Sequence, residues 1–427
     1  MLRPLRAVLV SALALVPAAP VVAQSGQAPA VEQVTFEEAV RRALDRHPSV
    51  GQAAQAILRA EAFLDQARSV FRPSVSGLVG TTVLDAERGF AGNVTQPRRQ
   101  SAFGATVSYP VLAPARWAER NQAADRVAIA RISAEEIRRQ VALAAAQSYL
   151  AVIATHRQLE ISTRNRETAR ALSEYARLRL EAGQGSRLNF VRASQEVATT
   201  EGRVQAASLA VRRTQEALGI AIFAEGPVDA TEDPRLRPVV PPSSEDTWLL
   251  ERPDVRLFTA ELQAADRMAR DVWKSWLPSA TAAFTPQYVT PPGFFEPAGT
   301  WRALFQMQVP IYDGTLGATK RLRIAERETA RLQLDAVKVQ ARSELRFAEE
   351  AVVRNEQIVA TTRDAAERAA EVLRITEVAY KAGATTNIEV IQAQQTARNT
   401  EVELALAEDR LRQARLDLLV ALGQFPQ

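Results

Sequence analysis

Two pairs of segments in the chain alternate between apolar residues and polar or small ones, a pattern typical of β-strands with one apolar face. The segments lie near 74–83, 102–109, 279–285 and 301–309. A loop containing Gly and Pro separates the members of each pair. We therefore predict two β-hairpins, about 73–111 and 278–312.

The apolar face of these strands carries large side chains at alternate positions. Six of them are expected to define it: Phe103, Val107, Tyr109, Trp301, Phe305 and Val309. The other face of the last strand carries Arg302, Gln306 and Gln308. The pattern fits strands that lie between lipid and a water-filled lumen. A half-buried sheet in a soluble protein would show the same alternation, so the pattern alone leaves both open.

Long stretches without Gly or Pro follow each hairpin and predict helices of unusual length. They cover 115–182 and 318–382 and are rich in Ala, Arg, Glu, Gln and Leu. Each would form a helix of roughly 100 Å at the usual rise per residue. Glycines end both stretches, and further helices about 188–219 and 387–422 return along them. Helices this long must pack lengthwise, as coiled coils or tubes.

Shorter helices precede the hairpins. Thr35 and Glu38 form a capping box that predicts a helix start at the beginning of the chain. A second helix is expected over about 50–70, with a counterpart over about 255–276. A proline follows each of these two helices and ends it.

The whole order of elements occurs twice. Early markers are Pro48, Val50, Pro73 and Ser74, which recur as Pro253, Val255, Pro278 and Ser279. A late marker is Ala217-Leu218-Gly219, which recurs as Ala421-Leu422-Gly423. We infer two structural repeats, about 31–220 and 244–423. A Pro-rich, non-helical linker over 221–243 joins them.

The N-terminus has the layout of a secretory signal peptide. Arg3 and Arg6 precede an apolar stretch over 7–16, and small residues follow up to Ala23. About ten apolar residues are too few to span a bilayer as a helix. We therefore expect residues 1–23 to be removed on export.

Composition excludes several classes of function. The chain has 53 basic and 49 acidic residues without long runs of one sign, so nucleic-acid binding has no support. It has no cysteine, which excludes disulfides, thiolate chemistry and a lipid anchor on an N-terminal cysteine. It has two histidines, which lie far apart, and no Gly-Xaa-Ser elbow. We therefore predict no enzyme activity, no catalytic residue, no cofactor and no metal site.

Four strands are too few to close a membrane barrel, and an open sheet edge is not stable in lipid. The chain must either stay soluble or pool its strands with other copies of itself. Three copies would supply twelve strands, an even number that can enclose a wet lumen. The long helices would then continue the barrel as a tube.

At this point the sequence resembles the TolC-like outer-membrane efflux proteins over nearly all of its expected mature length. The stretch from Thr35 to Pro48 resembles the N-terminal helix motif of that family, and the stretch from Tyr380 to Gln394 resembles its periplasmic-turn motif. The resemblance implies a mainly α fold with a small β part. It implies a homotrimer with a 12-stranded β-barrel in the outer membrane of a Gram-negative bacterium and an α-helical barrel in the periplasm. Its implied partners are outer-membrane lipid, a periplasmic adaptor (membrane fusion) protein and an inner-membrane pump.

The same resemblance assigns roles to the two turns between long helices. They span 183–187 and 383–387, and they would form the tip that the adaptor grips. The residues concerned are Gly183, Gln184, Gly185, Ser186, Gly383, Ala384, Thr385 and Thr386. Family members carry acidic residues just after the second turn, where they line the closed aperture.

Four residues of this chain stand at or opposite those aperture positions: Glu389, Gln392, Asn189 and Arg192. Gln392 departs from the family pattern because it is neutral. Thr385 stands where some members carry Arg, so this chain lacks the arginine of the usual locking ion pair. A solvated helix carboxylate is the alternative interpretation of Glu389.

The predicted function is export of small molecules or ions as the outer-membrane channel of a tripartite efflux system. The alternatives are the outer-membrane component of type I protein secretion, and a soluble periplasmic coiled-coil scaffold. The scaffold does not explain four strands in two hairpins. A phosphate-binding loop at 183–187 lacks the required spacing and does not follow a strand.

Overall fold

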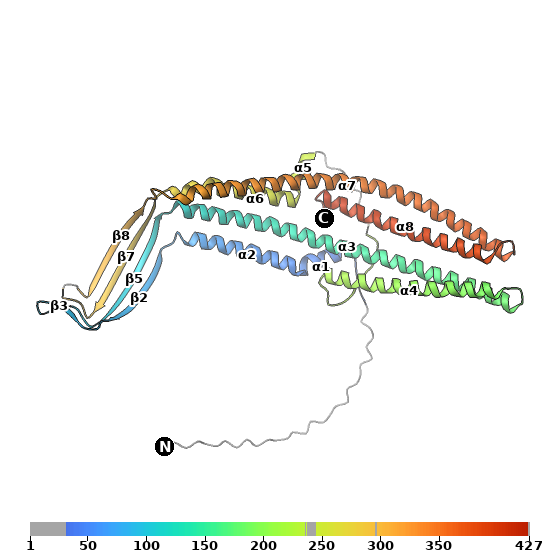
Figure 1. Cartoon of the computed structure of the whole chain (residues 1–427), viewed down its shortest axis with the longest axis horizontal. Helices are drawn as coiled ribbons and strands as arrows, with labels where there is room; N and C mark the ends of the chain where they lie inside the picture. Colours follow the sequence, from blue (N-terminus) through green and yellow to red (C-terminus); the bar gives the residue numbers. More distant parts are fainter. Residues whose placement is uncertain (1–30, 235, 237–244, 295–296, 426–427) are drawn as a thin grey trace, which may run out of the picture.

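The computed structural model describes residues 31–234, 236, 245–294 and 297–425. The predicted signal peptide and most of the second half of the predicted linker lie outside these residues. The described chain is an elongated helical body with a small β-sheet at one end and two helical turns at the other (Figure 1). No helix within the described ranges carries an apolar run long enough to cross a bilayer.

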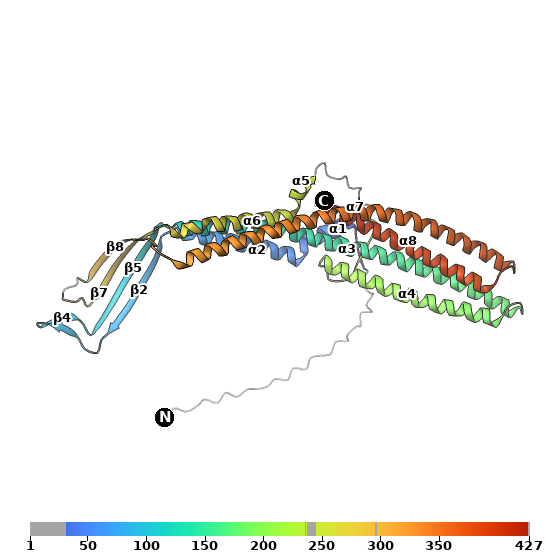
Figure 2. The same ribbon diagram turned by 45° about the horizontal axis from the view of Figure 1, so that its top comes forward.

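Two similar sets of helices make up the body. The first set is α1 (Phe36–Arg46), α2 (Pro48–Ser69), α3 (Pro114–Glu181) and α4 (Arg187–Ala221). The second is α5 (Glu245–Glu251), α6 (Pro253–Asp271), a 3-10 turn η1 (Val272–Trp276), α7 (Gly314–Lys381) and α8 (Asn387–Ala421). The two long helices α3 and α7 have 68 residues each, and α4 and α8 have 35 each. Figure 2 shows α4 returning along α3 and α8 along α7.

The main sheet has four antiparallel strands in the order β2-β5-β7-β8. Their bounds are Ser74–Val83, Arg99–Leu112, Ser279–Thr290 and Gly299–Gln308. Each predicted hairpin supplies two neighbouring strands, and β5 pairs with β7 across the repeats. The polar loop between β2 and β5 carries a small ribbon of its own, β3 (Arg88–Phe90) with β4 (Asn93–Gln96).

A further two-stranded sheet ties the start of the chain to the segment after α4. In it β1 (Glu32–Val34) pairs in parallel with β6 (Val228–Ala230). The pair closes a core in which Val34, Tyr149, Leu218 and Val228 are almost completely buried. The linker segment is therefore not irregular throughout, because its first part forms β6.

Small and branched residues fill the middle of the helical body, where the two repeats meet. Ala142, Ala146 and Leu150 of α3 pack with Leu416 and Leu419 of α8. Alanine at these positions lets the helix axes approach closely. The second repeat has an equivalent core around Trp248 and Leu345. The sheet and the helical turns extend away from this central region in opposite directions (Figure 2).

The helix caps explain where the elements begin and end. Thr35 accepts a hydrogen bond from the Glu38 amide, as the capping box predicts. His47 caps α2 by accepting from the Ser49 amide at 3.2 Å. At their C-terminal ends α3 and α7 place Gly183 and Gly383 at φ +73° and +77°. These are left-handed conformations that glycine adopts without a steric penalty.

The structure corrects one pair of repeat markers. Helices α3 and α4 match α7 and α8 with one constant spacing, so the end of α4 at Ala221 corresponds to the end of α8 at Ala421. The left-handed residue beyond α8 is Gly423, and its counterpart beyond α4 is Phe223, with φ 56°. Gly219 instead lies inside α4, where the Gly226 carbonyl passes too close for a side chain. The match of Ala217-Leu218-Gly219 to Ala421-Leu422-Gly423 was therefore wrong in register.

Candidate functional site

The four-stranded sheet has one apolar face, and the strand register defines it. Directly opposed residues point to the same side of a sheet. The row Val75–Val107–Phe284–Ala303 crosses all four strands, and Phe103 lies between Val79 and Tyr288. Tyr109 and Phe305 both face Ala282. Five of the six predicted apolar-face residues therefore share one side, and Val309 lies one residue beyond β8.

The other face of the sheet is polar. Its central row is Ser76–Thr106–Thr285–Arg302. The hydroxyl oxygens of Thr106 and Thr285 lie 3.4 Å apart, and those of Ser74 and Ser108 lie 2.7 Å apart. Gln306 and Gln308 continue this side along β8, as their alternation predicts. A sheet of four strands thus separates an apolar surface from a hydroxyl- and amide-rich one.

Both outer strands of the sheet present a free edge. The strand order places β2 at one edge and β8 at the other, and neither has a second neighbour in the described chain. Large side chains on the apolar face are unusually exposed: Val79 by 73%, Trp301 by 71% and Phe305 by 65%. A long, exposed and apolar edge is a template for pairing with another chain. The sheet of a single chain therefore leaves the outer edges of β2 and β8 without a neighbouring strand.

The opposite end of the molecule consists of the turns after α3 and α7. The residues of both turns are largely exposed, and each ends in a residue that begins the next helix. Ser186 caps α4 through the Leu188 amide at 3.2 Å. Gln184 and Ala384 each donate a backbone hydrogen bond back to the end of the preceding helix, at 2.9 and 2.8 Å. The predicted tip residues therefore form two turns of closely similar geometry.

The four candidate aperture residues lie in the first two turns of α4 and α8. Glu389 and Gln392 are exposed, whereas Asn189 and Arg192 are half-buried. Glu389 accepts hydrogen bonds from the hydroxyls of Thr385 and Thr386. The negative charge also lies at a helix N-terminus, which favours it. The local contacts thus hold Glu389 against its own turn.

A buried asparagine joins the two turns. The side chain of Asn387 is only 2% exposed and donates a hydrogen bond to the Asn189 carbonyl at 3.2 Å. Because α4 and α8 belong to different repeats, this bond fixes the relative position of the two helix starts. The spacing of residues in the sequence does not reveal this contact between the start of α8 and the candidate residue Asn189.

Charged residues connect the two helical hairpins between the centre and the tip. Arg157 and Arg164 of α3 pair with Glu408 and Glu401 of α8 at 2.7 and 2.8 Å. The arginines are one heptad apart on one helix and the glutamates one heptad apart on the antiparallel partner. The sequence contains this matched spacing, but the spacing alone does not identify the ion pairs, because it does not show that α3 and α8 are neighbours.

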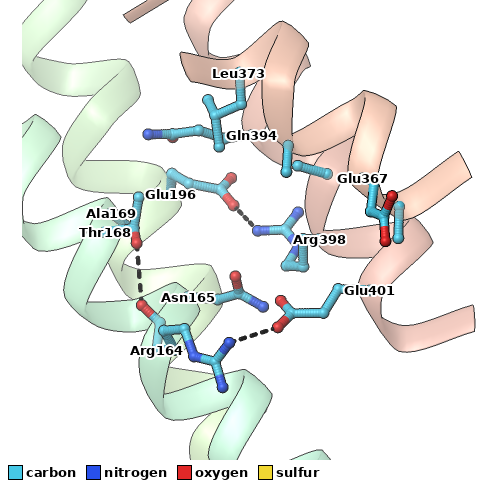
Figure 3. A pocket seen from close by; sticks show the side chains of 13 residues that line it. Arg164, Asn165, Thr168, Ala169, Glu196, Glu367, Leu373, Gln394, Arg398 and Glu401 are labelled. Atoms are coloured by element: carbon cyan, nitrogen blue, oxygen red, sulfur yellow. Dashed lines mark hydrogen bonds and ion pairs between the residues drawn. The ribbon is translucent and has the colours of Figure 1, made fainter. Parts of the chain in front are cut away.

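A third pair, Arg398 of α8 with Glu196 of α4, lies in the same region (Figure 3). Both side chains are almost buried, at 9% and 12% exposure. They border a cavity of about 400 Å³ between the hairpins, together with Arg164, Asn165 and Glu401. Apolar packing thus joins the repeats at the centre, and ion pairs join them toward the tip.

Neither histidine forms part of a metal or catalytic cluster. His47 is a helix cap, and His156 lies 2.6 Å from the Asp229 carboxylate. In the ranges that the structure describes, no group of three or more His, Asp and Glu residues could hold a metal ion.

The fold is a long helical body that carries a two-faced sheet with two free edges. The sequence profile of outer membrane efflux proteins matches residues 39–222 and 246–424, which is most of the chain. The chain belongs to the outer membrane efflux protein family. Among curated protein sequences, none matches this chain.

Solved structures share the fold at low sequence identity. The CmeC outer membrane channel of Campylobacter jejuni has a TM-score of 0.80 at 16% identity, covering 92% of this chain and 87% of that chain. The outer membrane protein VceC of Vibrio cholerae has a TM-score of 0.77 at 17% identity, covering 91% and 96%. The open state of the Neisseria gonorrhoeae MtrE outer membrane channel has a TM-score of 0.78 at 18% identity, covering 91% and 88%.

The family and the fold confirm the expected class. The protein is mainly α-helical with a small β part and has the TolC-like fold. It is an outer-membrane protein of an efflux system.

Proposed function

We propose that three copies of the chain join edge to edge into a closed channel. In this assembly β8 of one copy pairs with β2 of the next, which continues the antiparallel order of the sheet. Twelve strands then surround a lumen lined by the polar face, and the apolar face contacts outer-membrane lipid. The observation that carries the proposal is a two-faced sheet whose edges are both unpaired, because lipid does not tolerate open edges.

The helices support the same arrangement. On α7 the apolar residues Leu332, Val339 and Val353 are each more than half exposed and lie at heptad spacing. Such a stripe suits lengthwise packing against a helix of a neighbouring copy. The helical body of three copies would then form a tube that continues the barrel into the periplasm.

The tip is the proposed contact with the rest of the export machine. The turns at Gly183–Ser186 and Gly383–Thr386 are exposed and farthest from the sheet (Figure 1). A periplasmic adaptor protein would grip them and connect the channel to an inner-membrane pump. The chain itself is a conduit and not an enzyme, so the energy for export comes from the pump.

Glu389 is the proposed acid of the tip aperture, with Gln392, Asn189 and Arg192 around it. Three copies of Glu389 would form a negative ring that concentrates cations. Arg192 lies in the second turn of α4 and would partly neutralise that ring. The cargo is a small molecule or ion.

The test is the mass and conductance of the purified mature chain. In detergent we expect a particle with the protein mass of three chains, measured by light scattering with the detergent subtracted. Added to a planar bilayer, the same particle should give discrete conductance steps. A stable monomer in buffer without detergent, or a trimer that never conducts, would contradict the proposal.

A further inference from the structure

The strands of the main sheet are nearly free of charge. The strands β2, β5, β7 and β8 contain no Asp or Glu, and their only charged side chains are Arg99 and Arg302. Since the rest of the chain is rich in both signs of charge, these two arginines determine the electrostatic character of the sheet.

The two arginines lie on opposite faces. Arg302 opposes Thr285 in the central polar row, and it is exposed. Arg99 opposes Val83 and precedes Phe103 by two alternations, which places it on the apolar face. Of the described residues, none forms an ion pair with the Arg302 guanidinium, so its charge acts on the space in front of the polar face.

The surroundings of Arg302 suit an anion with an apolar part. Hydroxyls of Thr285 and Thr106 lie in its row, and the neighbouring rows contain the amide of Gln287 and the side chains of Leu78 and Leu304. Both leucines are exposed, Leu78 by 68% and Leu304 by 46%. A guanidinium and amide groups bind carboxylate or sulfonate, and leucine contacts an apolar body.

We propose that Arg302 makes the barrel section of the channel selective for anions, with amphipathic organic anions as the substrate class. The inference rests on the proposed trimer, in which three copies of Arg302 ring the lumen at one level. A ring of one sign inside low-dielectric walls raises the local concentration of the opposite ion. No acidic side chain of the four strands offsets this ring.

The first experiment compares variants of the purified trimer in planar bilayers under a KCl gradient. We expect Arg302→Gln to lower the ratio of chloride to potassium permeability by about twofold or more, and Arg302→Glu to lower it further. Arg99→Glu is the matched control, because it changes the same charge on the opposite face of the same sheet. Its permeability ratio should equal that of the wild type.

The second experiment uses the absence of cysteine in the chain. In Arg302→Cys the introduced thiol is the only one, so a charged methanethiosulfonate reagent modifies that position alone. A trimethylammonium reagent should restore the wild-type permeability ratio, whereas a sulfonate reagent should lower it further. Naphthalene-1-sulfonate should reduce the current of the wild type more strongly than that of Arg302→Gln.

Two results would overturn the inference while the channel function stands. One is a conducting Arg302→Glu channel with wild-type selectivity and wild-type block by naphthalene-1-sulfonate. The other is an Arg99→Glu channel that changes as much as Arg302→Glu. A wild-type trimer that does not conduct at all would instead overturn the proposed function, and this inference with it.

Discussion

Arg398 on α8 and Glu196 on α4 form a nearly buried ion pair, with 2.5 Å between Nη1 and Oε1, that joins the two repeats of the chain. Removing one partner leaves the other charge buried without compensation, which is far more costly than losing an exposed pair. Glu196→Ala should therefore destabilise the protein by about 3–5 kcal/mol. The midpoint of thermal unfolding in detergent measures this.

The neighbouring pair provides the control. Glu401 pairs with Arg164, but the two side chains are 31% and 57% exposed. Glu401→Ala should cost less than about 1 kcal/mol. The double replacement Glu196→Leu with Arg398→Met should recover most of the lost stability, since it removes both charges. Equal losses at Glu196 and Glu401 would refute the role of burial.

Substitution of Gly383 tests whether the turns at the tip dock the adaptor protein. Its φ of +77° disfavours any side chain with a Cβ, so Gly383→Val strains the turn by at least about 1–2 kcal/mol. We expect the Gly383→Val variant to assemble into trimers. Export should nevertheless be lost in cells whose chromosomal copy of the gene has been deleted. The same result is expected for Gly183→Val. Gly202→Ala is the control: it lies within α4 and has open space around it, so export should persist. Normal export by both valine variants would argue against docking at the tip.

Phe305 and Gln306 test the two faces of β8. Phe305→Arg should lower the stability of the folded protein by about 2–4 kcal/mol if the site lies near the membrane midplane. Gln306→Arg places the same side chain on the polar face and should have a small effect. Unfolding by urea in lipid vesicles compares the two variants. Similar losses at both positions would show that the faces are not lipid and lumen.

Substitution of Glu389 tests whether this residue lines the aperture at the tip. Glu389→Gln should reduce the sensitivity of single channels to block by trivalent cations, because three negative charges leave the tip. It should also raise the ratio of chloride to potassium permeability, because a ring that concentrates cations loses its charge. The hydroxyls of Thr385 and Thr386 that bind Glu389 can also bind Gln, so the turn should keep its shape. If cation block is unaltered, Glu389 does not line the aperture.

The lowered pKa of Asp254 predicts that the folded protein loses stability in acid. Burial alone would raise the pKa of Asp254, but hydrogen bonds and the charge of Arg252 outweigh burial and hold the pKa below its ordinary value of 3.8. A depressed carboxyl pKa contributes stability above that ordinary value and loses it as the pH falls through the folded value.

Stability should therefore decline below about pH 4, and Asp254→Asn should flatten that part of the profile while lowering stability at neutral pH. Chemical unfolding at several pH values measures both effects. Asp364→Asn is the control, since the Asp364 side chain is 59% exposed. A profile for Asp254→Asn as steep as that of the wild type would assign the acid sensitivity to other groups.

The sequence was sufficient for elements with a long or repeated signal. Glycine-free stretches predicted α3 and α7 to within a few residues, and alternation predicted four strands with the right faces. It was insufficient for elements too short to repeat an alternation of apolar and polar residues. The strands β1 and β6 have three residues each and are far apart in sequence, so neither shows a pattern. Phe223 shows why residue type alone can mislead, since it takes the conformation expected of glycine.

The sequence could nominate individual residues of the candidate site, but it could not show which of them are in contact. The turn glycines could be named because they end the long glycine-free stretches, and Glu389 was named from the resemblance to the family. The bond from Asn387 to the Asn189 carbonyl could not, because it joins residues of different repeats. The buried guanidinium of Arg252 is similar: it binds Asp254 nearby but also Glu344 and the Ala421 carbonyl at the far end of α8. The packing of the helices determines such partners, and the spacing of residues along the sequence does not reveal them.

The pairing of β1 with β6 has a consequence for the order in which the chain matures. Val34 reaches its final neighbours only after Val228 to Ala230 has emerged, since these residues complete the sheet. The strand β1 at the N-terminal end of the first repeat therefore stays unpaired while α3 and α4 are synthesised and exported across the inner membrane. A periplasmic chaperone that shields exposed apolar segments would be needed for longest at this end of the molecule.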